Sequence, residues 1–107
     1  MVIDSHQHFW IYDKERHAWI DDDMKVIRKD FMPSELKEVY TKNGIDGCIA
    51  VQADQTLEET DFLVSLANQN EFIKGVVGWI DLRLNKIDSH LEKYSNVNSV
   101  KGFRHIV

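Results

Sequence analysis

The strongest constraint on the fold is a regular alternation of short apolar segments with amphipathic ones. Four apolar segments, rich in β-branched or aromatic residues and bounded by turn residues or charges, are predicted to be strands; they cover residues 2–6, 47–52, 75–80 and 100–107. Gly47, Gly75 and Gly102 lie 28 and 27 residues apart. That period accommodates one strand, one helix and two short loops, so repeated strand–helix units are predicted.

Helices are predicted between these strands. In residues 34–42 the apolar side chains recur at the i, i+3, i+4 spacing of an amphipathic helix, with Pro33 in its first turn and Asn43-Gly44 at its end. Thr56 and Glu59 have the spacing of a capping box, which predicts the start of a second helix. A third helix is predicted from one apolar face, made of Leu84, Ile87, Leu91 and Tyr94.

Strict alternation of buried strands with helices predicts a parallel α/β architecture. Such units can close into a barrel or form an open, doubly wound sheet, and periodicity alone does not distinguish the two. A (β/α)8 barrel needs about 250 residues, whereas this chain has 107. Because a free-standing domain of this kind would leave a parallel edge open, we expect the chain to be truncated, as a fragment of a longer polypeptide.

Composition and charge argue against several kinds of partner and site. The formal net charge of −5 argues against nucleic acid, which requires a basic face. No apolar stretch approaches the roughly 20 residues of a membrane span, and no signal peptide is evident, so we expect a cytoplasmic protein with no membrane partner. Cys48, the single cysteine, is expected to be a small buried hydrophobic residue rather than a catalytic thiol. The acidic residues 21–23 are expected to form a solvated loop rather than a cation site.

The main chemical signal is the pair His6 and His8. Alternate side chains of a strand point the same way, so both rings can meet a single cation, for which neutral imidazole is a good ligand. The pair comes just after the apolar start of the first predicted strand. That places it at the strand's carboxyl end, where barrel enzymes build their sites.

Other candidates follow the later strands. Arg104 can bind a carboxylate or polarise a carbonyl; since adjacent residues of a strand face opposite ways, only one of Arg104 and His105 is expected to point inward, and Arg104 is favoured. Gln52 and Trp79 end the second and third predicted strands. There they either line the opening of the same site or serve as packing or loop-anchoring residues.

The long first loop, residues 9–32, contains Phe9, Trp10, Tyr12, His17 and Trp19. Its length and aromatic content favour an ordered segment, which serves either as a lid over the site or as a hydrophobic plug. His17 and His90 are expected at the surface.

Residues 2–10 (VIDSHQHFW) resemble the opening of the amidohydrolase-2 family, in its lactonase branch, which includes enzymes similar to L-fuconolactonase and L-rhamnono-lactonase. The resemblance continues in order through almost the whole chain, in residues 17–20, 30–33, 47–52, 75–81 and 101–105. It implies a (β/α)8 TIM barrel with its active site at the carboxyl ends of the strands. Residues 1–107 would then be the N-terminal portion of a single TIM-barrel domain, about its first four strands.

The resemblance also implies a set of site residues. His6 and His8 would be metal ligands, with zinc the expected divalent cation. Arg104 and His105 are the catalytic candidates, and the substrate contacts would come from Trp19, Gln52, Trp79 and Arg104. Family members open small lactones of sugar acids by attack of water on the lactone carbonyl, which a metal or a cationic side chain polarises. The general base would lie beyond residue 107, so the chain alone is expected to be inactive.

Several alternatives stay open at this point. The same fold supports decarboxylases and amide hydrolases, which only pocket residues and substrate tests distinguish from lactonases, and a member of the group can be metal-independent. A truncated barrel without catalysis, held together by self-association into a homo-oligomer across its open edge, is the non-enzymatic alternative.

Overall fold

The computed structural model describes residues 1–83 and 87–105. Four strands form one parallel sheet: β1 (Ile3–Gln7), β2 (Gly47–Val51), β3 (Ile73–Gly78) and β4 (Val100–Phe103). The helical elements between them are η1 (Asp22–Ile27, a 3-10 helix), α1 (Pro33–Asn43), α2 (Leu57–Gln69) and α3 (Asp88–Ser95). No helix in the described ranges is long and apolar enough to cross a membrane.

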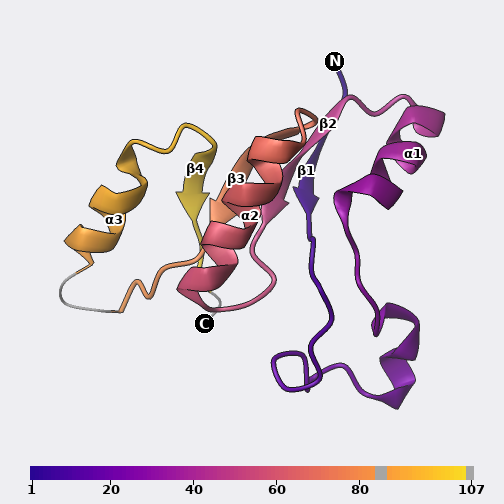
Figure 1. The fold of residues 1–107 in the computed structure, drawn as a ribbon, viewed down its shortest axis with the longest axis horizontal. Helices are drawn as coiled ribbons and strands as arrows, with labels where there is room; N and C mark the ends of the chain where they lie inside the picture. Colours follow the sequence, from indigo (N-terminus) through magenta and orange to yellow (C-terminus); the bar gives the residue numbers. More distant parts are fainter. Residues whose placement is uncertain (84–86, 106–107) are drawn as a thin grey trace.

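The strand order distinguishes the two architectures that the sequence allowed. Neighbouring strands are consecutive in the chain, in the order β1-β2-β3-β4 (Figure 1). A doubly wound sheet reverses its strand order at a switch point, whereas a (β/α)8 barrel adds its strands in sequence. The chain therefore has the fold of the first four strands of a TIM barrel, which confirms the predicted fold class.

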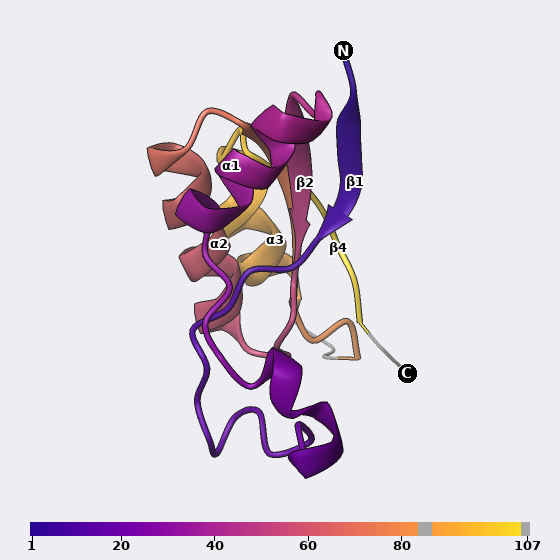
Figure 2. The ribbon, with the colours of Figure 1, turned by 90° about the vertical axis from the view of Figure 1, so that its right-hand side faces the viewer.

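The helices α1, α2 and α3 all lie on one face of the sheet (Figure 2). In a barrel this is the outer face, and the opposite face is the barrel interior. The core lies between the helices and the sheet, and is formed by Phe9, Tyr40, Cys48, Ala50, Leu63, Leu66, Ile73 and Val76. Cys48 is fully buried in this core, as the sequence predicts.

The helix caps agree with the sequence in part. Gly44 ends α1 in the left-handed conformation, with φ of 68°, and its N–H bonds to the carbonyl of Tyr40. Thr56 caps α2 by accepting a hydrogen bond from the backbone N–H of Glu59 at 3.1 Å. In a capping box the carboxylate of Glu59 would accept the backbone N–H of Thr56. Here it accepts the N–H groups of Ala53 and Asp54 instead, at 2.5 and 3.1 Å. Glu59 therefore holds the turn between β2 and α2.

Some expected boundaries differ from the structure. β3 begins at Ile73, two residues before the predicted start, and β4 ends at Phe103, so that Arg104 and His105 follow the strand rather than lie within it. The predicted continuation through residues 106–107 and the predicted helix start at residues 84–86 lie outside the described residues. Periodicity marks the apolar part of an element but does not fix where its backbone hydrogen bonds stop.

Candidate active site

A cavity of about 490 Å³ opens at the carboxyl end of the sheet. Parallel strands all end at the same edge, so residues that follow different strands meet there. The cavity is lined by the end of β1, by the long loop that follows β1, by the turn between β2 and α2, and by the residue that follows β4. Its lining residues are His8, Trp10, Arg16, His17, Trp19, Ala53, Asp54, Gln55 and Arg104.

The two histidines of the first strand converge as predicted. The Nε2 atoms of His6 and His8 lie 3.1 Å apart, and their rings meet edge to face. The Nδ1 atom of His8 lies 3.0 Å from the carbonyl oxygen of Val51. Because a carbonyl only accepts, Nδ1 carries the proton, and the lone pair of Nε2 is free to bind a cation.

This geometry fits a metal ion shared by the two rings. Two Zn–N bonds of about 2.0–2.1 Å at a tetrahedral angle would separate the two nitrogens by about 3.4 Å, close to the observed spacing. Burial lowers the pKa of His8, as do the nearby His6 and Arg104 to a smaller extent, and so favours the neutral, metal-binding form. Within residues 1–83 and 87–105, no group of three or more His, Cys, Asp or Glu side chains could hold a metal, so His6 and His8 are two candidate ligands and not a complete metal site.

A carboxylate–phenol pair, partly buried at Asp4 and buried at Tyr40, adjoins His6. The Oδ1 atom of Asp4 accepts the backbone N–H of His6 at 3.1 Å, and its Oδ2 accepts the hydroxyl of Tyr40 at 2.6 Å. The register of β1 against β2 shifts between Asp4 and Gln7, so this contact lies where the strand departs from regular pairing. Sequence reasoning missed both residues; the one available signal was an aspartate two positions before His6.

Arg104 reaches the cavity and is held by Gln52. Its Nε donates to Oε1 of Gln52, and its Nη2 donates to the Gln52 carbonyl at 3.0 Å. Gln52 is fully buried and does not line the cavity. Of the two roles that the sequence left open for Gln52, the structure shows the structural one: its amide positions Arg104 and donates to the carbonyl of Asp54 at 3.0 Å. Its predicted contact with substrate stays a prediction.

Trp79 and His105 form a separate group beside the cavity. Their rings stack with centroids 5.8 Å apart, and Nδ1 of His105 lies 4.0 Å from Oδ1 of Asp81. Neither residue lines the cavity. Of the adjacent pair after β4, only Arg104 therefore reaches it, which agrees with the expectation that one of the two points inward and with the preference for Arg104. The predicted site roles of Trp79 and His105 stay predictions.

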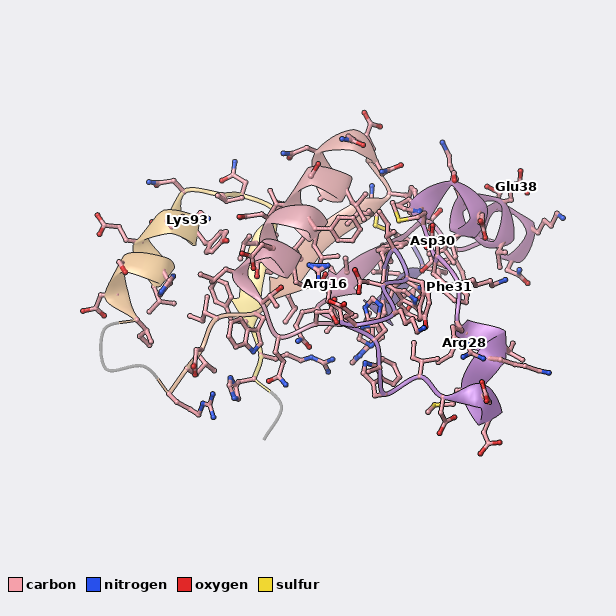
Figure 3. All side chains as sticks on the ribbon, turned by 60° about the horizontal axis from the view of Figure 1, so that its bottom comes forward. Arg16, Arg28, Asp30, Phe31, Glu38 and Lys93 are labelled. Atoms are coloured by element: carbon pink, nitrogen blue, oxygen red, sulfur yellow. The ribbon has the colours of Figure 1, made fainter. Side chains whose placement is uncertain are left out.

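The first loop both packs against the core and forms a cavity wall. Phe9 and Ile20 are buried, whereas Trp10, Arg16 and Trp19 line the cavity. The side chain of Arg16 extends from this loop toward the start of α2 (Figure 3). The two alternatives for the loop, plug and lid, thus each describe part of it.

The surface position expected for His17 is wrong. His17 is 1% exposed, its Nδ1 accepts the backbone N–H of Asp13 at 2.9 Å, and its Nε2 lies 3.2 Å from Oδ2 of Asp54. Asp54 lies 37 residues away in the chain, so no local pattern could reveal the pair. His90, expected at the surface as well, is partly exposed on α3.

Comparison with known proteins adds close relatives. The chain is 38% identical over 103 residues to an L-fucono-1,5-lactonase of Burkholderia multivorans and 29% identical over 102 residues to one of Burkholderia ambifaria. These alignments cover 96% and 95% of this chain, which spans about a third of each relative, 34% and 35%. No family model matches the chain.

Solved structures agree with the sequence comparison. Two crystal structures of an amidohydrolase from Burkholderia multivorans, one with bound zinc and one with bound HEPES, superpose with a TM-score of 0.91 at 37% identity. Each match covers 98% of this chain and 37% or 36% of the solved chain. The resemblance to amidohydrolase-type lactonases that the sequence motifs indicated is thus confirmed along nearly the whole chain.

Proposed function

We propose that this chain is the amino-terminal part of an amidohydrolase-type enzyme that opens a small sugar-acid lactone. The observation that carries the proposal is a pair of imidazole nitrogens, 3.1 Å apart, of which the His8 member lines the same cavity as Arg104. The supporting similarity is to two L-fucono-1,5-lactonases.

The reaction is the addition of water to the lactone carbonyl carbon, followed by cleavage of the ring C–O bond. The ring oxygen takes up a proton, and the product is an open hydroxy acid. His6 and His8 would hold a divalent cation, zinc foremost, which would supply Lewis-acid polarisation when bound.

Arg104 is suited to stabilise charge on the carbonyl oxygen. Two of its nitrogens are fixed by Gln52, and Nη1 makes no hydrogen bond to any described residue. A guanidinium fixed at one edge presents its other edge in a preorganised direction, so it can donate to the oxygen as negative charge develops there. Trp19, 56% exposed at the cavity, offers a flat face to the sugar ring.

The complete active site would need groups from elsewhere in a longer polypeptide. We propose that residues 1–107 are the N-terminal portion of one TIM-barrel domain, with further metal ligands and the general base contributed by later strands. The proposal includes a cytoplasmic location and assembly as a homo-oligomer, which cell fractionation and the mass in solution would test.

The first experiment is to measure the intact mass and bound metal of the full-length gene product, and its hydrolysis of hexono-1,5-lactones. We expect a mass near that of a complete barrel and stoichiometric metal. His6→Ala should remove metal, and Arg104→Ala should lower kcat by about 100- to 1000-fold, the range seen when one oxyanion donor is lost.

Two matched controls separate site effects from general damage. His90→Ala and Arg28→Ala remove the same side chains from partly exposed positions outside the cavity lining, and should leave metal content and activity unchanged. A product of 12.5 kDa that binds no metal and hydrolyses no lactone would refute the proposal.

A further inference from the structure

Asp54 is the only acidic residue among those that line the cavity in the described part of the chain. Its side chain is 10% exposed, so it is largely buried yet reaches the cavity surface. A buried carboxylate is costly unless its oxygens find hydrogen-bond partners. The hydrogen bonds that Asp54 makes, and the acceptor positions that it leaves open, therefore indicate its role.

Three neighbours fix the position of Asp54. Its backbone N–H donates to Glu59 at 3.1 Å, and its carbonyl accepts from Nε2 of Gln52 at 3.0 Å. Since Nδ1 of His17 accepts a backbone N–H, the imidazole proton lies on Nε2 and is donated to Oδ2 of Asp54 at 3.2 Å. The other oxygen, Oδ1, has no hydrogen-bond partner among the described residues, although a carboxylate can accept about four hydrogen bonds.

The cations of the cavity do not neutralise this carboxylate. In residues 1–83 and 87–105, neither Arg16 nor Arg104 forms an ion pair with Asp54 within 4.0 Å, although all three line the same cavity. The space between them suits a group that donates to a carboxylate and accepts from a guanidinium. A hydroxyl group does both, whereas a carboxylate on the ligand would be repelled by Asp54.

The aromatic lining favours a ring that carries such hydroxyls. Trp10 and Trp19 line the cavity with Asp54 and Arg16, and indole rings offer large apolar faces beside polar groups. Flat aromatic faces with a few directed polar groups are typical of sites that orient a small ligand.

We infer that Asp54 selects hydroxylated lactones by accepting hydrogen bonds from ring hydroxyl groups, with His17 as the positioning residue that orients its carboxylate. This inference rests on the proposed lactonase function and deepens it. It assigns the carbonyl end of the substrate to Arg104 and the histidines, and the hydroxyl face to the wall formed by the first loop and the β2–α2 turn.

The test compares two substrates of the full-length gene product: a hexono-1,5-lactone, and δ-valerolactone, which has the same six-membered ring without hydroxyls. A site that hydrogen-bonds a hydroxyl discriminates strongly against analogues that lack it. Asp54→Asn should therefore lower the ratio of kcat/KM for the hexonolactone over that for δ-valerolactone by about 10- to 100-fold. An equal effect on both substrates, or none, would overturn the inference while leaving the lactonase function standing.

His17 needs variants that separate orientation from folding. His17→Gln keeps an N–H donor near Asp54 and should retain more of the substrate ratio than His17→Ala, with thermal melts to confirm that both fold. Asp22→Asn is the matched control, since Asp22 is an exposed residue of the same loop, paired with Arg28, outside the cavity lining. The inference fails for His17 if the Gln and Ala variants shift the ratio equally.

Calorimetric titration with the pyranose form of the same hexose decides the case if no lactone is hydrolysed. Binding that Asp54→Asn weakens at least tenfold would uphold the hydroxyl site and refute the lactonase function. Absence of both hydrolysis and binding would refute both proposals.

Discussion

Two histidine rings can share a cation only if the backbone that carries them is held in place. Here Asp4 accepts the N–H of His6 with one oxygen and the hydroxyl of Tyr40 with the other. On the second ring, the carbonyl of Val51 fixes the proton of His8 on Nδ1. Loss of a group that orients a metal ligand in this way typically weakens metal affinity by about 10- to 100-fold.

Replacement of Tyr40 by Phe tests this role at the level of one hydroxyl. The variant should lose about 0.5–1.5 kcal/mol of unfolding free energy, because the partly buried carboxylate of Asp4 loses one hydrogen bond, and should bind zinc about 10- to 100-fold more weakly. Urea unfolding and a competitive zinc titration measure the two effects.

Tyr94→Phe is the matched control. The hydroxyl of Tyr94 in α3 also donates to a carboxylate, that of Asp61 in α2, at 2.7 Å, and neither residue contacts the histidine pair. This variant should lower stability and leave zinc affinity unchanged. Equal zinc affinity of the wild type and Tyr40→Phe would contradict the positioning role.

Glu59 predicts a pH dependence of stability. Burial raises the pKa of its carboxyl above the ordinary value, against the opposing effect of the two backbone N–H groups that it accepts. In the window between the ordinary pKa of about 4.3 and the raised one, the unfolded chain has released this proton while the folded chain still holds it. The contribution of Glu59 to stability is therefore full below that window and is lost as pH rises through the raised pKa.

The measurement is urea unfolding of the wild type and Glu59→Gln from pH 4 to pH 8. The stability of the wild type relative to the variant should fall with rising pH and then level off. A difference that rises with pH would show that the two N–H bonds to the carboxylate outweigh its burial.

At the scale of elements, α2 is joined to the end of β3 by one threonine. The Oγ1 atom of Thr60 accepts the backbone N–H of Trp79 and donates to its carbonyl, each at 2.8 Å. Gly78 makes this approach possible, because a Cβ at that position would lie 2.6 Å from Cγ2 of Thr60. Glycine is therefore required here for packing rather than for backbone conformation.

Gly78→Ala should destabilise the protein by about 1–3 kcal/mol, the usual cost of overpacking. Gly102→Ala, in the neighbouring strand β4, is the control, because a Cβ there meets nothing within 4 Å; it should change stability by less than about 1 kcal/mol. Thermal or urea unfolding of both variants checks the difference. A similar loss of stability in both variants would mean that strand conformation, and not contact with Thr60, explains the need for glycine at position 78.

At the scale of the whole molecule, β1 and β4 are the two outer strands of the sheet. Their outward backbone groups have no strand partner in the described part of the chain, and the helices cover one face of the sheet (Figure 2). Open strand edges favour pairing with other chains. A barrel removes both edges by closing the sheet.

The 107-residue chain expressed alone is accordingly expected to self-associate and to lack lactonase activity. Size-exclusion chromatography with light scattering reports the first property, and the lactone assay reports the second. A monomeric and active 107-residue chain would contradict both the open edges and the need for later strands.

The sequence by itself determined the features that depend on neighbouring residues. The alternation of strands and helices, the caps at Gly44 and Thr56, and the placement of His6 and His8 at the end of a strand all follow from local pattern and spacing. Strand geometry also predicted that only one of Arg104 and His105 would reach the site, although both residues follow β4 rather than lie within it. These predictions hold because a strand or helix dictates where side chains a few positions apart will point.

Only the tertiary structure decided which distant residues meet. The sequential strand order, which favours a barrel over an open sheet, is set by how the units pack. Tyr40 finds Asp4 across 36 residues, His17 finds Asp54 across 37 and Arg104 finds Gln52 across 52. Each pair comes from different loops or elements that a parallel sheet brings together, so its members carry no mutual signal along the chain until the sheet forms.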